Sequence, residues 1–89
     1  MAIGAAVGGM LLLIGAGASW ARPDCGAADR GAWLPEGEMK SRITSTGYRI
    51  DIFKVTREGC YEIYGRDPAG ARIEVYYHPV TGEVVRSSR

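Results

Sequence analysis

Hydrophobic and polar residues alternate along the chain from Tyr48 onward, which is typical of a β-strand with one buried face. In the first of these runs, Tyr48, Ile50 and Ile52 are separated by charged residues. The alternation changes parity at Phe53, where a regular strand would turn its apolar side chains to the other face. We therefore expect a β-bulge or a strong twist near Ile52.

Further runs of strand composition follow at short intervals. Residues 59–64 are predicted to form the central strand, because strand-like runs lie one tight turn away on each side. Residues 67–70 fit a type I turn position by position, with Asp first, Pro second and Gly fourth. A third strand is expected at 72–77 and a short fourth strand or edge extension at 83–86. The tail, residues 87–89, is expected to fray.

The segment between Trp33 and Gly47 has helical periodicity instead. Pro35 suits a first-turn position, acidic residues follow it near the positive end of the helix dipole, and Gly47 can end the helix. Met39 and Ile43 are four residues apart and share one face. So narrow an apolar stripe can lie on a sheet but cannot stand alone. The predicted fold class is α+β, with one N-terminal helix packed on a three- to four-stranded antiparallel sheet.

The N-terminal residues 1–21 differ sharply from the rest, because they carry no charged side chain and have an apolar centre. Small residues ending at Ala21 follow that centre, which is the layout of a secretory signal peptide. The alternative is an uncleaved membrane anchor, since about 20 apolar residues can span a bilayer. Residues 22–32 are expected to form an irregular lead-in, and residues 33–89 the single domain. In either case we expect the domain to be periplasmic or secreted.

The chain has two cysteines, Cys25 and Cys60. A domain of fewer than seventy residues is marginally stable without a covalent or metal crosslink. The favoured interpretation is a disulfide between the two cysteines, which persists outside the cytoplasm, and the alternative is a pair of free thiols. A metal site is not predicted. The chain offers only His78 as a ligand beside the two cysteines, and the spacing of these three residues fits no metal-binding motif.

Charge and candidate catalytic groups narrow the class of function. The net charge of +1 provides no basic field for nucleic acid, and a membrane is expected as a partner only if residues 1–21 are retained. His78, beside a proline, is expected to cap a turn, and no serine has the context of an activated nucleophile. We therefore expect a protein that is not an enzyme and uses no cofactor.

A candidate binding surface is expected on the sheet face turned away from the helix. Tyrosines interleaved with arginines are favoured in recognition surfaces, although they can also simply cover a sheet. Glu62 and Glu74 lie on adjacent predicted strands and could form a carboxylate pair. The favoured alternative is a solvated, cross-strand ladder of charges with the neighbouring arginines. Replacement of Tyr64 and Tyr76 by alanine should cost little stability if their side chains are solvated. The predicted surface comprises Tyr64, Tyr76, Arg49, Arg72, Glu62 and Glu74.

An ordered set of short motifs follows the cysteine at position 25. They are Gly59-Cys60-Tyr61-Glu62-Ile63, Asp67-x-x-Gly70, Arg72-Ile73-Glu74 and Pro79-x-Thr81-Gly82-Glu83-Val84-Val85. In this set the chain resembles the PepSY family, and in particular the small, secreted, single-domain PepSY-like proteins of proteobacteria. The resemblance covers about residues 25–89. The chain departs from the family at His78, where an acidic residue commonly precedes the proline.

The resemblance implies a helix packed on an antiparallel sheet and an origin among protease propeptides, where such domains are thought to restrain or chaperone a peptidase. The expected function is a non-enzymatic binding module of the cell envelope that docks on a protein partner, such as a peptidase, and modulates it. The alternative is a carrier of a small ligand, with a pocket between helix and sheet lined by Trp33, Met39 and Tyr48.

Overall fold

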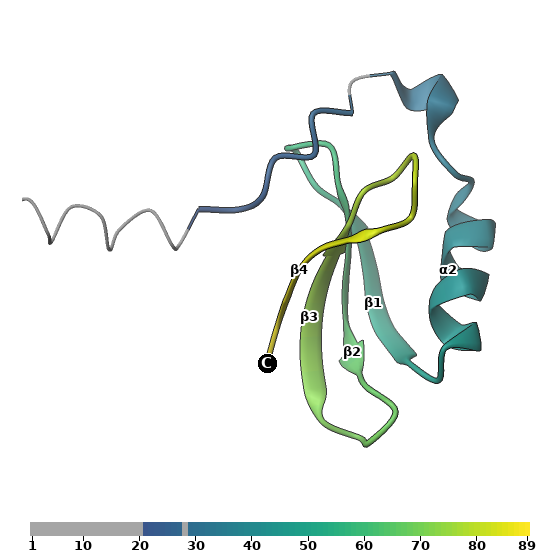
Figure 1. Cartoon of the computed structure of the whole chain (residues 1–89), viewed down its shortest axis with the longest axis vertical. Coiled ribbons are helices and arrows are strands. Elements are labelled where there is room, and N and C mark those ends of the chain that lie inside the picture. The colour runs from purple at the N-terminus through teal and green to yellow at the C-terminus, as the bar shows by residue number, and fades with distance from the viewer. Residues whose placement is uncertain (1–20, 28) are drawn as a thin grey trace, which may run out of the picture.

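The computed structural model describes residues 21–27 and 29–89, and it confirms the α+β class. One helix packs against a four-stranded antiparallel sheet (Figure 1). The predicted signal peptide lies outside the described residues, apart from its last residue. Within the described residues, no helix is both long and apolar enough to cross a membrane. The elements are the 3-10 helix η3 (Arg30–Ala32), the helix α2 (Glu36–Ser45) and the strands β1 (Arg49–Val55), β2 (Tyr61–Arg66), β3 (Arg72–Tyr77) and β4 (Val84–Ser88).

The sheet is a meander in the order β1-β2-β3-β4, so each strand pairs with its neighbour in sequence. Gly59 and Gly70 close the first two hairpins with φ of 82° and 90°, in the left-handed region where glycine is preferred. The fourth strand continues to Ser88, which pairs with Glu74. The expected fraying of residues 87–88 was therefore wrong, because these residues find backbone partners on β3.

The predicted bulge is present, since the register of β1 on β2 shifts between Ile50 and Ile52. Gly65 on β2 pairs with Ile50 at this point. A Cβ atom at Gly65 would collide with the backbone carbonyl oxygen of Arg49. The bulge thus brings two backbones too close for any side chain, which explains the glycine inside a strand.

The helix begins directly after Pro35 and ends shortly before Gly47, whose φ is 93°. Met39 and Ile43 are the buried residues of α2, as their spacing predicted. Beside this stripe, Glu38 and Arg42 form an exposed ion pair, with 3.2 Å between the carboxylate and guanidinium atoms. The helix therefore has one narrow apolar stripe, and the sheet completes its burial.

The core lies between α2 and one face of the sheet. Tyr61 stands at its centre and donates a hydrogen bond of 2.6 Å from its hydroxyl to the carbonyl oxygen of Leu34. Its ring meets that of Trp33 edge to face, at 5.1 Å between centroids. The buried residues of the core are Met39, Ile43, Tyr61, Ile63, Ile73, Val75 and Tyr77.

Candidate functional site

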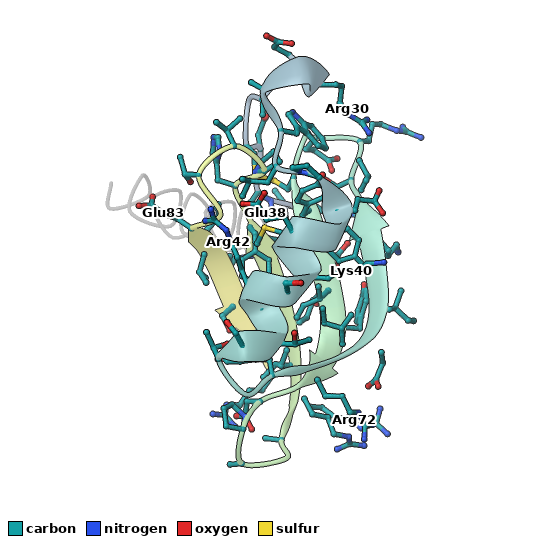
Figure 2. The ribbon with its side chains drawn as sticks, turned by 90° about the vertical axis from the view of Figure 1, so that its right-hand side faces the viewer. Arg30, Glu38, Lys40, Arg42, Arg72 and Glu83 are labelled. Carbon is teal, nitrogen blue, oxygen red and sulfur yellow. A yellow bond between two sulfur atoms is a disulfide. The ribbon has the colours of Figure 1, made fainter. Side chains whose placement is uncertain are left out.

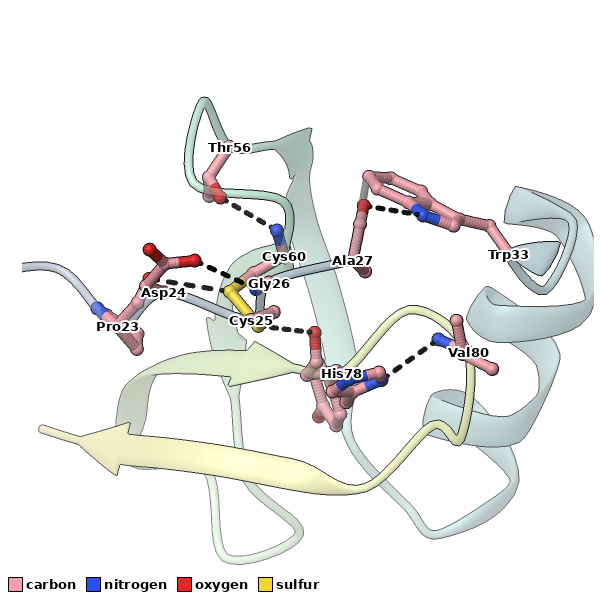
Figure 3. The surroundings of a disulfide bond; sticks show 11 residues. Pro23, Asp24, Cys25, Gly26, Ala27, Trp33, Thr56, Cys60, His78 and Val80 are labelled. Atoms are coloured by element: carbon pink, nitrogen blue, oxygen red, sulfur yellow. Dashed lines mark hydrogen bonds between the residues drawn. A yellow bond between two sulfur atoms is a disulfide. The ribbon is translucent and has the colours of Figure 1, made fainter. Parts of the chain in front are cut away.

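The disulfide between Cys25 and Cys60 ties the N-terminal lead-in to the start of β2 (Figure 3). The two Cα atoms are 5.3 Å apart, and the residues are separated by 35 positions. The backbone N–H of Cys25 donates to the carbonyl of Glu58, and that of Cys60 donates to the hydroxyl of Thr56. The predicted disulfide is thereby confirmed, and the alternative of two free thiols is excluded.

The lead-in is more ordered than its composition predicted. Asp29 caps η3 through its side chain, so the end of this segment is a helical turn rather than irregular chain. The indole N–H of Trp33 donates to the carbonyl of Ala27 at 3.1 Å, and the Arg86 guanidinium donates to the carbonyl of Ala21 at 2.8 Å. The lead-in is therefore held to the turn before β2 and to Trp33, and Ala21, the residue before it, contacts β4.

The lone histidine behaves as a turn cap, as expected. The Nδ1 atom of His78 accepts a hydrogen bond of 3.2 Å from the backbone N–H of Val80 (Figure 3). This contact uses the ring nitrogen to stabilise the turn before β4. Among the described residues, no three side chains of His, Cys, Asp or Glu are grouped so that they could hold a metal ion.

The six residues of the predicted binding surface differ in their exposure to solvent. Tyr64 is 36% exposed, and Arg49 and Arg72 are exposed near the ends of their strands. Arg49 is held by Asp51, with 3.2 Å between the guanidinium and carboxylate atoms. These three residues remain accessible on the sheet face opposite α2, the face to which strand alternation assigned Tyr64.

Glu62 and Tyr76 share that face but are buried, with exposed fractions of 0% and 5%. Glu62 pairs across the sheet with Lys54 on one side and with Tyr76 on the other. The Arg86 guanidinium lies over the ring of Tyr76, at 5.3 Å from the centroid. The expectation of a solvated charge ladder was wrong for Glu62, because its carboxylate is buried and its neighbours are Glu74, Tyr64 and Tyr76 instead of an arginine.

The four side chains Glu62, Tyr64, Glu74 and Tyr76, hereafter the carboxyl cluster, perturb one another. Burial raises the pKa of Glu62, and the neighbouring Glu74 carboxyl acts in the same direction. The interaction with Glu62 lowers the pKa of Glu74. Burial and the two carboxyls raise the pKa of Tyr76 to about 12, and its hydroxyl donates to Glu74 Oε2 at 3.0 Å. The two carboxyls therefore titrate as a pair in which Glu62 holds a proton more strongly.

This pairing has a consequence for stability. Because the folded state raises the pKa of Glu62, the folded protein binds more protons than the unfolded chain above the ordinary glutamate pKa. Stability contributed by this group is thus full at low pH and is lost as the pH rises through the folded-state pKa. We expect Glu62→Gln to match the parent in melting temperature near pH 4.5 and to exceed it by several degrees at pH 8. Thermal melts across this range test the prediction.

Glu83→Gln is the matched control, because Glu83 is an exposed glutamate in the turn before β4. It should leave the pH profile of the melting temperature unchanged. Parallel profiles for Glu62→Gln and the parent would show that the Glu62 carboxyl is solvated in the folded state.

On the other face of the sheet, a groove of about 440 Å³ runs between α2 and strands β3 and β4. It includes Met39 and Tyr48, two of the three residues predicted to line a pocket, whereas Trp33 packs on Tyr61 instead. The sequence did not predict that β4 forms one wall of the groove. The apolar Val84, on a strand expected at the edge of the sheet, was the feature that could have indicated it. Its lining residues are Met39, Arg42, Ile43, Thr46, Tyr48, Val75, Tyr77, Gly82, Val84 and Ser87.

Comparison with known protein families shows to which family the chain is related. The sequence profile of the peptidase propeptide and YPEB domain family matches residues 5–88. The chain belongs to this PepSY family. Domains of this family are generally non-catalytic modules of the propeptide type. Searches of curated proteins and of solved structures found no significant match.

Proposed function

We propose that this PepSY protein is a non-enzymatic binding module of the periplasm or the secreted fraction that docks on a protein partner and modulates a peptidase. The observation that carries the proposal is the family match over residues 5–88, since the family is that of a peptidase propeptide domain. The Cys25–Cys60 disulfide supports an extracytoplasmic site, where such bonds persist.

The docking surface that we propose is the sheet face opposite α2, with Tyr64 at its centre. Tyr64 is exposed, and the ammonium of Lys54 lies 5.4 Å from its ring centroid. Arg72 is exposed in the same region, where it lines a depression of about 230 Å³ together with Tyr64 and Glu74. Tyrosine and arginine are both enriched among the residues that contribute most binding energy at protein interfaces.

A second candidate function, a carrier of a small ligand in the cell envelope, is favoured by one observation. The groove between α2 and strands β3 and β4 has a volume within the range of small-molecule sites, about 300–1,000 Å³, and a mainly apolar lining. Native mass spectrometry of the protein purified from its host would show a retained small molecule if this function is correct.

The docking surface is tested by Tyr64→Ala. We expect this variant to melt within a few degrees of the parent, because the side chain is more than one third exposed. Loss of a central interface tyrosine typically costs about 2 kcal/mol of binding free energy, roughly a thirtyfold weaker complex. The measurement is the affinity for, and inhibition of, each purified peptidase that the parent protein retains from periplasmic extract.

Val55→Ala is the control, because Val55 has a matched exposure of 37% but lies outside the proposed surface. It should leave affinity and inhibition unchanged. Equal weakening by both variants would remove Tyr64 from the interface, and a parent protein that retains and affects no peptidase would refute the modulating role.

A further inference from the structure

The fold leaves one edge of the sheet open beside the groove. The strand order ends at β4, and none of the described strands pairs with its outer edge. Figure 2 looks onto α2 with β4 behind it to the left, and Arg42 lies in the gap between the helix and that strand. The unpaired N–H and C=O groups of an edge strand can accept a further strand. An open backbone edge and an apolar groove thus lie next to each other.

The open edge is also apolar. Val84 is 57% exposed and lines the groove, and Val85 is 44% exposed. Val85 is the extra residue where the register of β3 on β4 shifts, because Tyr77 pairs with Val84 and Tyr76 with Arg86. Exposed apolar residues on an edge strand are costly for a soluble domain, which favours a role in binding.

Strand β1, at the opposite edge of the sheet, carries more charge against pairing with another chain. Strand β1 carries the bulge between Ile50 and Ile52 and three charged side chains, Arg49, Asp51 and Lys54. Bulges and charges are the features by which edge strands avoid pairing with other chains. Strand β4 has one charged side chain, Arg86, which lies over Tyr76 on the face away from the groove. Both edge strands have a register irregularity, so the two edges differ in charge, and β4 is the less charged of the two.

The groove also selects the charge of its occupant. Arg42 is the one charged residue of its lining, which contains no acidic side chain. The Arg42 side chain is 51% exposed, and its partner Glu38 is equally solvated, so this ion pair contributes little. A Cβ atom at Gly82 would lie 3.1 Å from Arg42 Nη1, so the glycine leaves space for the guanidinium at the rim. A carboxylate entering the groove would find an available cation there.

We infer that β4 and the groove form a docking site for an extended segment of a protein partner, which pairs with β4 as a fifth strand. Side chains on one face of a strand recur every second residue, so the segment would place alternate apolar side chains in the groove. An acidic residue of the segment would reach Arg42. This inference rests on the proposed function and adds to it a second contact surface, on the other face of the sheet from Tyr64, together with the chemistry of the segment that this surface would recognise.

The test uses the protein as isolated from its host, with the disulfide intact, and amidated synthetic peptides of eight residues. The probe alternates leucine with threonine and ends in glutamate, and a scrambled peptide of the same composition removes the alternation. We expect the probe to bind about tenfold more tightly than the scrambled peptide and to slow amide exchange in β4. Replacing its glutamate by glutamine should weaken binding to the parent, but not to Arg42→Gln.

A matched pair of variants locates the site. Val84→Asp should weaken binding of the probe at least about tenfold by placing a charge in the groove. Ile52→Asp, at 53% exposure on β1, should leave binding unchanged, and both variants should keep the fold. Equal weakening by the two variants, protection of β1 in place of β4, or binding of decanoate without binding of the probe would each overturn the inference. If Tyr64→Ala abolishes peptidase binding while Val84→Asp has no effect on it or on the probe, the docking site fails and the proposed function stands.

Discussion

Replacement of both Cys25 and Cys60 by alanine is expected to lower the free energy of unfolding by about 4 kcal/mol, because the crosslink closes a loop of about 35 residues in the unfolded chain. In a domain of this size, each kcal/mol shifts the melting temperature by about 4–8 °C, so a loss of roughly 15–30 °C follows. Differential scanning calorimetry of the variant and of the parent measures this shift.

Reduction of the disulfide provides the control for this prediction. A reductant should lower the melting temperature of the parent toward that of the double variant and leave the variant itself unchanged. A variant that melts within a few degrees of the oxidised parent would mean that hydrogen bonds of the lead-in, such as Cys25 N–H to Glu58 and Trp33 to Ala27, hold it without the crosslink.

Tyr76→Ala is expected to cost about 3–5 kcal/mol of stability, the range for truncation of a large buried ring. Tyr76 is 5% exposed, and its hydroxyl donates to Glu74 while its ring lies beneath Arg86. Truncation would leave a cavity beside Glu62 and remove the hydrogen bond that Glu74 accepts. Urea denaturation at neutral pH measures the change, and its slope shows whether the folded state stays compact.

Two variants separate the parts of this effect. Tyr76→Phe keeps the ring and removes the hydroxyl, so it should cost about 1 kcal/mol. Tyr64→Ala, on the same face but exposed, should cost less than about 1 kcal/mol. If the two alanine variants prove equally mild, Tyr76 is solvated, and the carboxyl cluster does not form a buried unit.

The elements and their order could be predicted from the sequence because each has a local cause. Strand alternation located the bulge near Ile52, the third strand matched residues 72–77, and Met39 and Ile43 identified the buried side of the helix. The disulfide followed from the number of cysteines and the size of the domain. These signals depend on neighbours in sequence or on composition, which a single sequence contains.

Burial on the sheet face opposite α2 could not be predicted in the same way. Alternation correctly assigned Tyr76 and Glu62 to that face, but it does not show whether a face without a helix is exposed. Glu62 lies opposite Lys54 of β1 and Tyr76 lies opposite Arg86 of β4, so the surroundings of both residues come from neighbouring strands of the sheet. The groove was only partly foreseen for a similar reason, since its β4 wall depends on where the last strand returns.

The meander also determines the order in which the molecule can assemble. Every strand pairs with the strand next to it in sequence, and hairpins of this kind close within microseconds, whereas contacts between distant residues form more slowly. The links between residues far apart in the sequence include the bond from Cys25 to Cys60 and the hydrogen bond from the Leu34 N–H to the carbonyl of Pro79. The sheet can therefore form before any oxidant acts. Oxidation then closes a structure whose strands are already in register. Because two cysteines allow a single intramolecular pairing, formation of this disulfide needs a thiol oxidant but no disulfide isomerase.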